Sequence, residues 1–283
     1  MAAFREASRD WLLARTVAIY GALDEESPEG EEDPIPELLG SGVLLRIAGV
    51  GFLLSAAHVM SVAAEPGVTL YVSPVESGAQ VIPLHGVEVQ HTVDQTNVDL
   101  AFVRLPREID EALRPHREFL RLSDLDRETG PLRDGWFAVG GFPGALTRQG
   151  VAPIQSDVLY YGTTPYRGEL TEKAEGLTIA LSLPPDDPMG FDGKPTVLPD
   201  LSGISGCGMW QLLERNGLRC WRLENIRLVG ITLAEVKAGG TRIAIQGCRV
   251  EHVVACIWRA YPDLRPSIAV SIPWKPRLVL PAR

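Results

Sequence analysis

Short runs of Val, Ile, Leu and Thr, separated by Gly, Pro and Asp, fill the chain from residue 16 onward. Such runs predict β-strands joined by turns, as in antiparallel barrels or sandwiches, and long helical patterns are scarce. In the first half the predicted strands are TVAIYGA, SGVLLRIAG, VGFLLSA, VTLYVSP, GVEVQHTV and DLAFVRL. This set is about the number that a six-stranded barrel needs to close.

A second set of similar runs follows residue 134 and comprises WFAVGGF, APIQSDVLYYG, LTIALSL, GCGMWQLL, IRLVGITLAEV and TRIAIQG. The segment between the two sets, residues 106–134, is charged and contains three prolines, which is typical of a connector. The sequence therefore predicts an all-β fold of two antiparallel six-stranded β-barrels. A site shared by two such barrels would lie in the cleft between them.

Near the C-terminus, one apolar helical face is formed by Val250, Val253, Val254, Ile257, Trp258 and Tyr261. This spacing predicts a helix that docks on a barrel, with His252 facing solvent. We expect four parts: an N-terminal helical segment (1–15), the first barrel (16–125), the second barrel with the C-terminal helix (126–261), and an extended tail (262–283) rich in proline.

Composition narrows the range of partners. The 283 residues include 36 acidic and 27 basic side chains, a net charge of -9, which argues against nucleic-acid binding. Charges interrupt the apolar residues at the N-terminus, so we expect neither a secretory signal nor a membrane span there, and a cytoplasmic location. The cysteines at 207, 220, 248 and 256 have no CxxC spacing, so disulfides and zinc are not expected.

Three motifs supply the residue types that acyl transfer needs: SAAHV around His58, NVDLAFVRL around Asp99 and GISGCG around Ser205. A serine hydroxyl is a poor nucleophile at neutral pH, so an imidazole must take its proton and a carboxylate must orient that imidazole. We therefore predict that His58, Asp99 and Ser205 form a catalytic triad. In the folded chain His58 Nε2 should lie about 3 Å from Ser205 Oγ.

In this order, the three motifs resemble those of the trypsin-like (chymotrypsin-fold) serine peptidases, and FAVGGFPG resembles the entry to that family's second barrel. The chain is closest in character to bacterial HtrA-type intracellular members, over roughly residues 41–261, without a PDZ domain. The resemblance implies a serine endopeptidase that forms an acyl-serine intermediate and needs no cofactor. It also implies that the amides of Gly203 and Ser205 form the oxyanion hole.

The nucleophile motif departs from the family pattern at two positions. Cys207 stands where Gly-x-Ser-Gly-Gly has its last glycine, and we interpret it as a packing residue, since Ser205 occupies the glycine position that a cysteine nucleophile would need. Ile204 replaces the Asp that binds a new N-terminus in members matured by cleavage. We therefore expect no propeptide removal, and control by a partner, by assembly or by ordering of a loop.

Two acidic residues are candidates for binding a Lys or Arg side chain of the substrate. Asp200 lies one residue from the position that selects basic side chains in digestive relatives, and Glu235 belongs to the run that resembles the pocket-wall strand. Both could equally be solvated surface charges. Asp94 is a rival to Asp99 as the orienting acid, but it falls in DQTN, a stretch typical of turns.

Two functions stay open at this stage. The first is an endopeptidase that acts on a dedicated protein target, under the control of a regulatory partner. The second is a catalytically inactive protein of the same fold that binds a peptide or protein by strand addition. Neither requires a cofactor, a metal, nucleic acid or a membrane.

Overall fold

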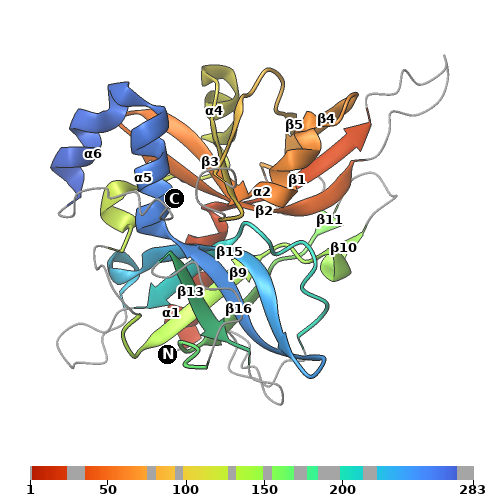
Figure 1. The fold of residues 1–283 in the computed structure, drawn as a ribbon, viewed down its shortest axis with the longest axis vertical. Helices are drawn as coiled ribbons and strands as arrows, with labels where there is room; N and C mark the ends of the chain where they lie inside the picture. The colour runs from red at the N-terminus through yellow and green to blue at the C-terminus, as the bar shows by residue number, and fades with distance from the viewer. Residues whose placement is uncertain are drawn as a thin grey trace, which may run out of the picture.

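The structure is a computed structural model, which describes residues 2–23, 36–74, 81–92, 98–126, 132–148, 155–168, 177–183, 198–212 and 222–272. It is mostly β, with two antiparallel sheets and helices near both ends of the chain (Figure 1). The two-sheet, mostly antiparallel architecture agrees with the predicted fold class. No helix in the described part combines the length and apolar character needed to cross a membrane.

The first sheet contains the strands β1 (Thr16–Leu23), β2 (Glu37–Ile47), β3 (Val50–Ala56), β4 (Val68–Val72), β5 (Ile82–Pro83), β6 (Val89–His91) and β7 (Leu100–Arg104). Their order is β5-β4-β1-β2-β3-β7-β6, and every pair along this path is antiparallel. A short strand that the sequence did not predict, β8 (Leu120–Arg121), adds to β2 in parallel. Over the described residues the pairings leave this sheet open between β5 and β6.

The second sheet has the order β12-β9-β14-β15-β16-β13. Its strands are β9 (Trp136–Gly141), β12 (Leu159–Thr163), β13 (Thr178–Ser182), β14 (Gly208–Leu212), β15 (Arg227–Ala238) and β16 (Thr241–Arg249). Just beyond β12, the Tyr166 amide donates to Ala180 O at 3.0 Å and the Ser182 amide donates to Thr164 O at 2.8 Å. These bonds link the two outer strands of the sheet.

Smaller elements fill the connections. They are the hairpin β10 (Thr147–Arg148) and β11 (Gln155–Ser156), the helices α2 (Ala57–Met60) and α4 (Arg107–Leu113), and the 3-10 turns η1 (Ser61–Ala64), η2 (Leu122–Asp124), η3 (Gly144–Leu146) and η4 (Leu223–Asn225). The predicted connector, residues 106–134, thus contains α4, β8 and η2 rather than only an irregular link. At the N-terminus, α1 (Ala2–Leu13) places Trp11 edge-on against Trp210 of β14, with ring centroids 5.7 Å apart.

The C-terminal region confirms one prediction and corrects two. Helix α5 (Val250–Ala260) forms where the apolar spacing predicted it. Residues 262–272, predicted to be extended, instead form η5 (Pro262–Leu264) and α6 (Arg265–Ser271), because a proline is tolerated in the first turn of each element. His252 does not face solvent: it is only 2% exposed, since α5 is covered on more than its apolar face. Residues 273–283 of the predicted tail lie outside the described residues.

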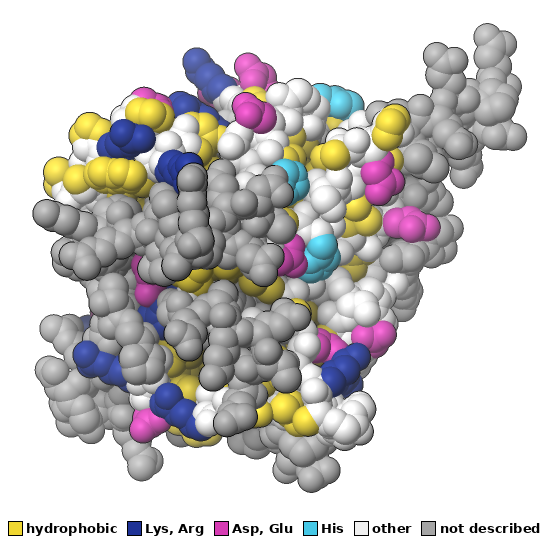
Figure 2. Space-filling view, viewed as in Figure 1, with side chains coloured by type: hydrophobic (Ala, Val, Ile, Leu, Met, Phe, Trp, Pro, Cys, Tyr) yellow, Lys and Arg dark blue, Asp and Glu magenta, His cyan; other side chains and the backbone are white. Residues whose placement is uncertain are grey.

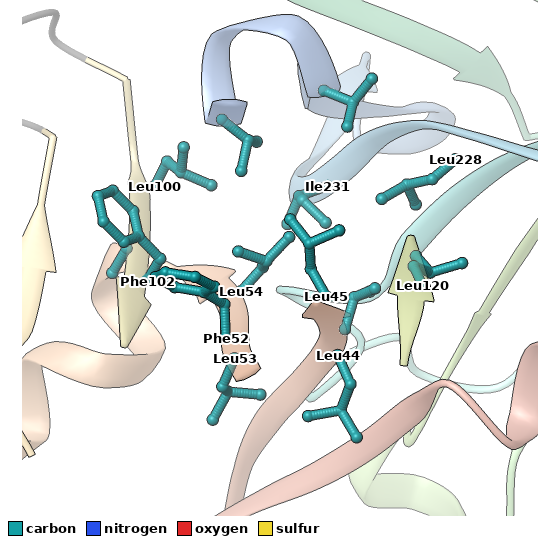
Figure 3. Close-up of a cluster of buried hydrophobic side chains, with 14 of the residues drawn as sticks. Leu44, Leu45, Phe52, Leu53, Leu54, Leu100, Phe102, Leu120, Leu228 and Ile231 are labelled. Carbon is teal, nitrogen blue, oxygen red and sulfur yellow. The ribbon is translucent and has the colours of Figure 1, made fainter. Parts of the chain in front are cut away.

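One apolar core joins the two sheets. Side chains of β2, β3, β7 and β8 meet Leu228 and Ile231 of β15 in the cluster that Figure 3 shows, and α5 adds Val253, Val254 and Ile257. Leu54, Leu100 and Ile231 are fully buried there. Because protein interiors pack densely, this shared core fixes the position of β15 relative to β3 and β7. The residues that follow β3 and precede β7 and β14 are placed by that packing.

Candidate active site

His58 lies in the single turn of helix α2, directly after the buried strand β3. The neighbours Ala57, Val59 and Met60 are buried, whereas the His58 side chain is 51% exposed. The buried residues therefore anchor the turn while the imidazole reaches the surface. Figure 2 shows histidine side chains exposed on the face in view, one of them beside an acidic side chain.

Asp99 precedes β7, which pairs with β3 so that Leu100 lies opposite Ala56. This register places the Asp99 carboxylate against His58: it accepts hydrogen bonds from Nδ1 at 2.5 Å and from the main-chain amide at 2.9 Å. The Ala57 amide also donates to Asp99 O at 3.2 Å. The structure thus brings these two predicted triad members together, with Nδ1 engaged and Nε2 left for another partner.

The environment of Asp99 favours the charged carboxylate. Partial burial raises the pKa of this group. The hydrogen bonds from the His58 ring and main chain, together with the charge of His58, lower the pKa by a larger amount, so it lies below its ordinary value. An ionised carboxylate on Nδ1 selects the tautomer in which Nε2 can accept a proton.

Ser205 sits in two consecutive tight turns. The Ile204 amide donates to Leu201 O and the Cys207 amide donates to Ile204 O, both at 3.0 Å. Gly203 (φ 96°) and Gly206 (φ 88°) occupy the third position of these turns, where a type II turn requires positive φ. The sequence SGISGC supplies glycine at both positions, so the local chain itself dictates the bend around Ser205.

Two amides of this turn have no hydrogen-bond acceptor among the described residues. Along 202–207, the Ser202 amide donates to Asp200 and the Gly206 amide donates to Thr232 O, while those of Ile204 and Cys207 close the turns. The remaining amides are those of Gly203 and Ser205, the pair predicted to form the oxyanion hole. They are available to an acceptor from outside the chain.

The Ser205 turn packs against the first sheet beside His58. A Cβ built on Gly40 would lie 2.6 Å from Val59, the residue after His58, and 3.0 Å from Ser205 O. The Ser205 hydroxyl, however, lies 3.4 Å from Leu233 O, and the described residues contain no hydrogen bond between Ser205 and His58. The predicted bond of about 3 Å is therefore not formed in this conformation of the serine side chain.

Cys207 is a buried packing residue. Its side chain is fully buried and its Sγ lies 3.3 Å from Thr232 Oγ1. Burial raises the pKa of this thiol to about 12, more than the bond to Thr232 lowers it. A fully buried thiol that stays protonated is out of reach of a substrate, which agrees with a packing role for Cys207.

The two carboxylates considered for substrate binding already have partners within the chain. Asp200 accepts hydrogen bonds from the Ser202 amide at 3.1 Å and hydroxyl at 3.0 Å, and these lower its pKa. Glu235 lies 3.5 Å from Lys237 and 3.6 Å from Arg242. Asp200 therefore serves the turn, and Glu235 belongs to a cluster with two cations. Selection of a basic side chain by either residue stays a prediction.

The other histidine, cysteine and acidic residues that the structure describes form no metal site. In the described part of the chain, no group of three or more His, Cys, Asp or Glu side chains could hold a metal ion. Cys207, Cys248 and Cys256 are buried free thiols. Cys220 and Asp94 lie outside the described residues.

Ser41 is a site residue that the motifs missed. It is fully buried in β2 and hydrogen-bonded to the Ser205 turn. The signal available in the sequence was a polar residue inside an apolar strand, LLGSGVLL, since a hydroxyl buried there requires partners.

No protein-family model matches the chain, and no curated protein matches it significantly. Among solved structures it is similar to a chain from work on the coupled folding and binding of the intrinsically disordered Sesbania mosaic virus VPg protein. That similarity has a TM-score of 0.47 and 15% sequence identity, over 85% of this chain and 87% of that one. A likeness at this level gives no information about function.

Proposed function

We propose that this protein is a serine endopeptidase that hydrolyses peptide bonds through an acyl-serine intermediate. The observation that carries the proposal is the Asp99 carboxylate that holds His58 through Nδ1, next to a serine turn whose Gly203 and Ser205 amides have no acceptor in the described part of the chain. The ordered resemblance of the three motifs to trypsin-like peptidases, and within them to HtrA-type members, supports the same assignment.

In the proposed reaction, the Ser205 hydroxyl leaves Leu233 O by rotation about χ1 and gives its proton to His58 Nε2 as Oγ attacks the substrate carbonyl. The carbonyl oxygen becomes an oxyanion that accepts hydrogen bonds from the Gly203 and Ser205 amides. Collapse breaks the C–N bond, and His58 returns the proton to the departing amine. Water then gives a proton to His58 as its oxygen attacks the acyl carbon, the ester C–O bond breaks to release the acid, and His58 returns the proton to Ser205 Oγ.

The edge of β15 is a suitable place for the substrate backbone. Up to Ile231 this strand pairs with β14, but from Ala234 to Ala238 it pairs only with β16 among the described residues. Such an edge offers main-chain donors and acceptors to an extended peptide. The edge begins next to Leu233, whose carbonyl accepts the Ser205 hydroxyl, so a bound peptide would pass the nucleophile.

The proposal includes a finer view of the fold, in which each sheet curls into a barrel as in chymotrypsin-like peptidases, although the first sheet has eight strands instead of the six predicted. The hydrogen bonds between 164–166 and 180–182 support this for the second sheet. It also includes a dedicated protein substrate. The proposed cytoplasmic location rests on the charges that interrupt the N-terminal apolar residues, and the proposed control by a regulatory partner rests on Ile204, which replaces the family's activation Asp.

A second candidate is a peptide-binding module without catalysis. The observation that favours it is the Ser205 hydroxyl bonded to Leu233 O instead of His58, beside an edge strand that could still hold a peptide.

A fluorophosphonate probe separates the two functions because it labels only an activated serine. If the protein is an enzyme, the full-length chain should be labelled, and the label should be lost in Ser205→Ala. Labelling should be retained in Ser123→Ala, which removes an exposed serine distant in sequence from Ser205. If the native protein binds extended peptides but no serine is labelled, the binding module is the better assignment.

A further inference from the structure

We infer that Ser41 is a positioning residue: its hydroxyl and amide hold the Ser205 turn in the conformation in which the Gly203 and Ser205 amides have no acceptor among the residues that the structure describes. The catalytic meaning of this inference rests on the proposed peptidase function. Its structural content is that one buried serine of the first sheet controls the turn, and this part does not depend on the peptidase function.

Ser41 makes direct contact with the turn at two carbonyl groups. Its amide donates to Ser205 O at 2.8 Å, and its Oγ donates to Gly203 O at 2.9 Å. The same Oγ accepts a hydrogen bond from the Phe142 amide at 2.9 Å, at the end of β9. One side chain therefore connects β2 to both the turn and the second sheet.

These bonds complete a set that fixes the whole turn. Besides the two carbonyls held by Ser41, Ser202 O accepts from the Gly144 amide at 2.7 Å and Ile204 O accepts from Cys207 at 3.0 Å. Four consecutive carbonyls are thus engaged. In a trans peptide the N–H points opposite to the C=O, so fixing the carbonyls also fixes the amides. The peptide that carries the Ser205 amide lies between the two peptides that Ser41 holds.

A hydroxyl is the group that this position requires. It must accept a bond from Phe142 and donate one to Gly203, and an alkyl side chain can do neither. Space is also limited, because a Cβ built on Gly141 would lie only 2.9 Å from Ser41 Oγ. In Ser41→Ala, the Phe142 amide and the Gly203 carbonyl lose their partner, and the Gly203–Ile204 peptide can turn to find another.

Ser55 provides a matched control. It is also a fully buried serine of the first sheet, and its Oγ donates to Ser41 O at 2.7 Å, so Ser55→Ala removes one hydrogen bond without releasing a carbonyl of the turn. Both variants lose a buried hydroxyl, and we expect both to lower Tm, Ser41→Ala by more because it removes two hydrogen bonds and Ser55→Ala removes one. Only Ser41→Ala should alter the turn itself.

The experiment compares wild type, Ser41→Ala and Ser55→Ala in two measurements on the full chain. The first is fluorophosphonate labelling, separated into the affinity of the probe and the rate constant of inactivation. We expect the rate constant to fall about 10- to 100-fold in Ser41→Ala with the affinity unchanged, because displaced catalytic groups slow the chemical step. Ser55→Ala should stay near wild type.

The second measurement is amide hydrogen exchange by NMR, which does not depend on activity. The amides of Ile204 and Gly206, which are hydrogen-bonded in the structure, should exchange at least about tenfold faster in Ser41→Ala than in Ser55→Ala. If wild type is not labelled but this local increase appears, the turn assignment stands and the peptidase function fails. Equal exchange of these amides in both variants, or an unchanged inactivation rate in Ser41→Ala, overturns the inference.

Discussion

His252 should make the fold sensitive to mild acid. It lies in α5, is 2% exposed, and has Nε2 3.5 Å from Cys256 Sγ, while Nδ1 is buried without a hydrogen-bond partner among the described residues. Burial lowers the pKa of this imidazole to about 4, from 6.5 in an unfolded chain. The imidazole is therefore neutral in the folded protein at pH values where the unfolded chain binds a proton.

The sign and size of the effect follow from proton linkage. Between pH 6.5 and 4 the unfolded state binds more protons at this position, so the free energy of unfolding falls as the pH falls. Above pH 6.5 the His252 imidazole is neutral in both the folded and the unfolded state, so it causes no loss of stability there. At pH 4.5 the loss from His252 amounts to about 2.5 kcal/mol, a large part of the stability of an ordinary domain.

His252→Leu removes the titrating group and puts in its place an apolar side chain that favours the helical conformation of α5. Urea unfolding at pH 7.5 and pH 4.5 gives the free energy of unfolding of each protein, and the decrease between the two pH values should be about 2.5 kcal/mol smaller in the variant than in wild type. The exposed His116, changed to Gln, serves as the control and should behave as wild type. An equal decrease in wild type and His252→Leu would refute the reasoning.

Three further predictions concern the site. Asp99→Asn should slow fluorophosphonate labelling about 1,000- to 10,000-fold with little change in Tm, because an amide favours the wrong tautomer of His58. Cys207 should resist alkylation in the native protein at pH 8 and react only after unfolding, as peptide mapping by mass spectrometry would show, since its pKa is about 12. Gly206→Ala should lower the Tm of thermal unfolding far more than Gly240→Ala. Both glycines have positive φ, but only at Gly206 would an added Cβ lie 2.1 Å from both Ser41 O and Ser55 Oγ. Similar Tm values for the two variants would contradict this prediction.

The strands could be predicted from the sequence because their hydrophobic runs are bounded by turn residues. VGFLLSA corresponds residue for residue to β3, and IRLVGITLAEV lies almost entirely within β15. Elements whose formation depends on distant partners were missed: β8 exists because Leu120 meets Leu45 of β2, and nothing local in residues 120–121 indicates a strand. Helix α6 was missed because prolines on both sides favoured an extended tail.

The acidic partner of the histidine could also be predicted, since Asp99 opens an apolar strand where a carboxylate needs a reason to be buried. The roles of Asp200 and Glu235 could not be decided in advance. A carboxylate that caps a turn and one that binds a substrate have the same sequence pattern. The structure adds that Asp200 accepts a hydrogen bond from Ser202 and that Glu235 lies near Arg242, and a substrate role for either residue stays a prediction.

The arrangement of the site depends on the packing between the sheets as well as on its motifs. His58 and Asp99 are positioned by the pairing of β3 with β7, whereas the Ser205 turn is attached to β15 through Thr232 and to β2 through Ser41. The core that joins Ile231 of β15 to Leu54 of β3 holds these two halves in one relative position. A hydrogen bond between a buried strand serine and a turn carbonyl tolerates displacements of only a few tenths of an ångström. The two Ser41 bonds, together with the bond from the Gly144 amide to Ser202 O, therefore convert the packing of the sheets into the direction of the amides at Gly203 and Ser205, which no single motif could specify.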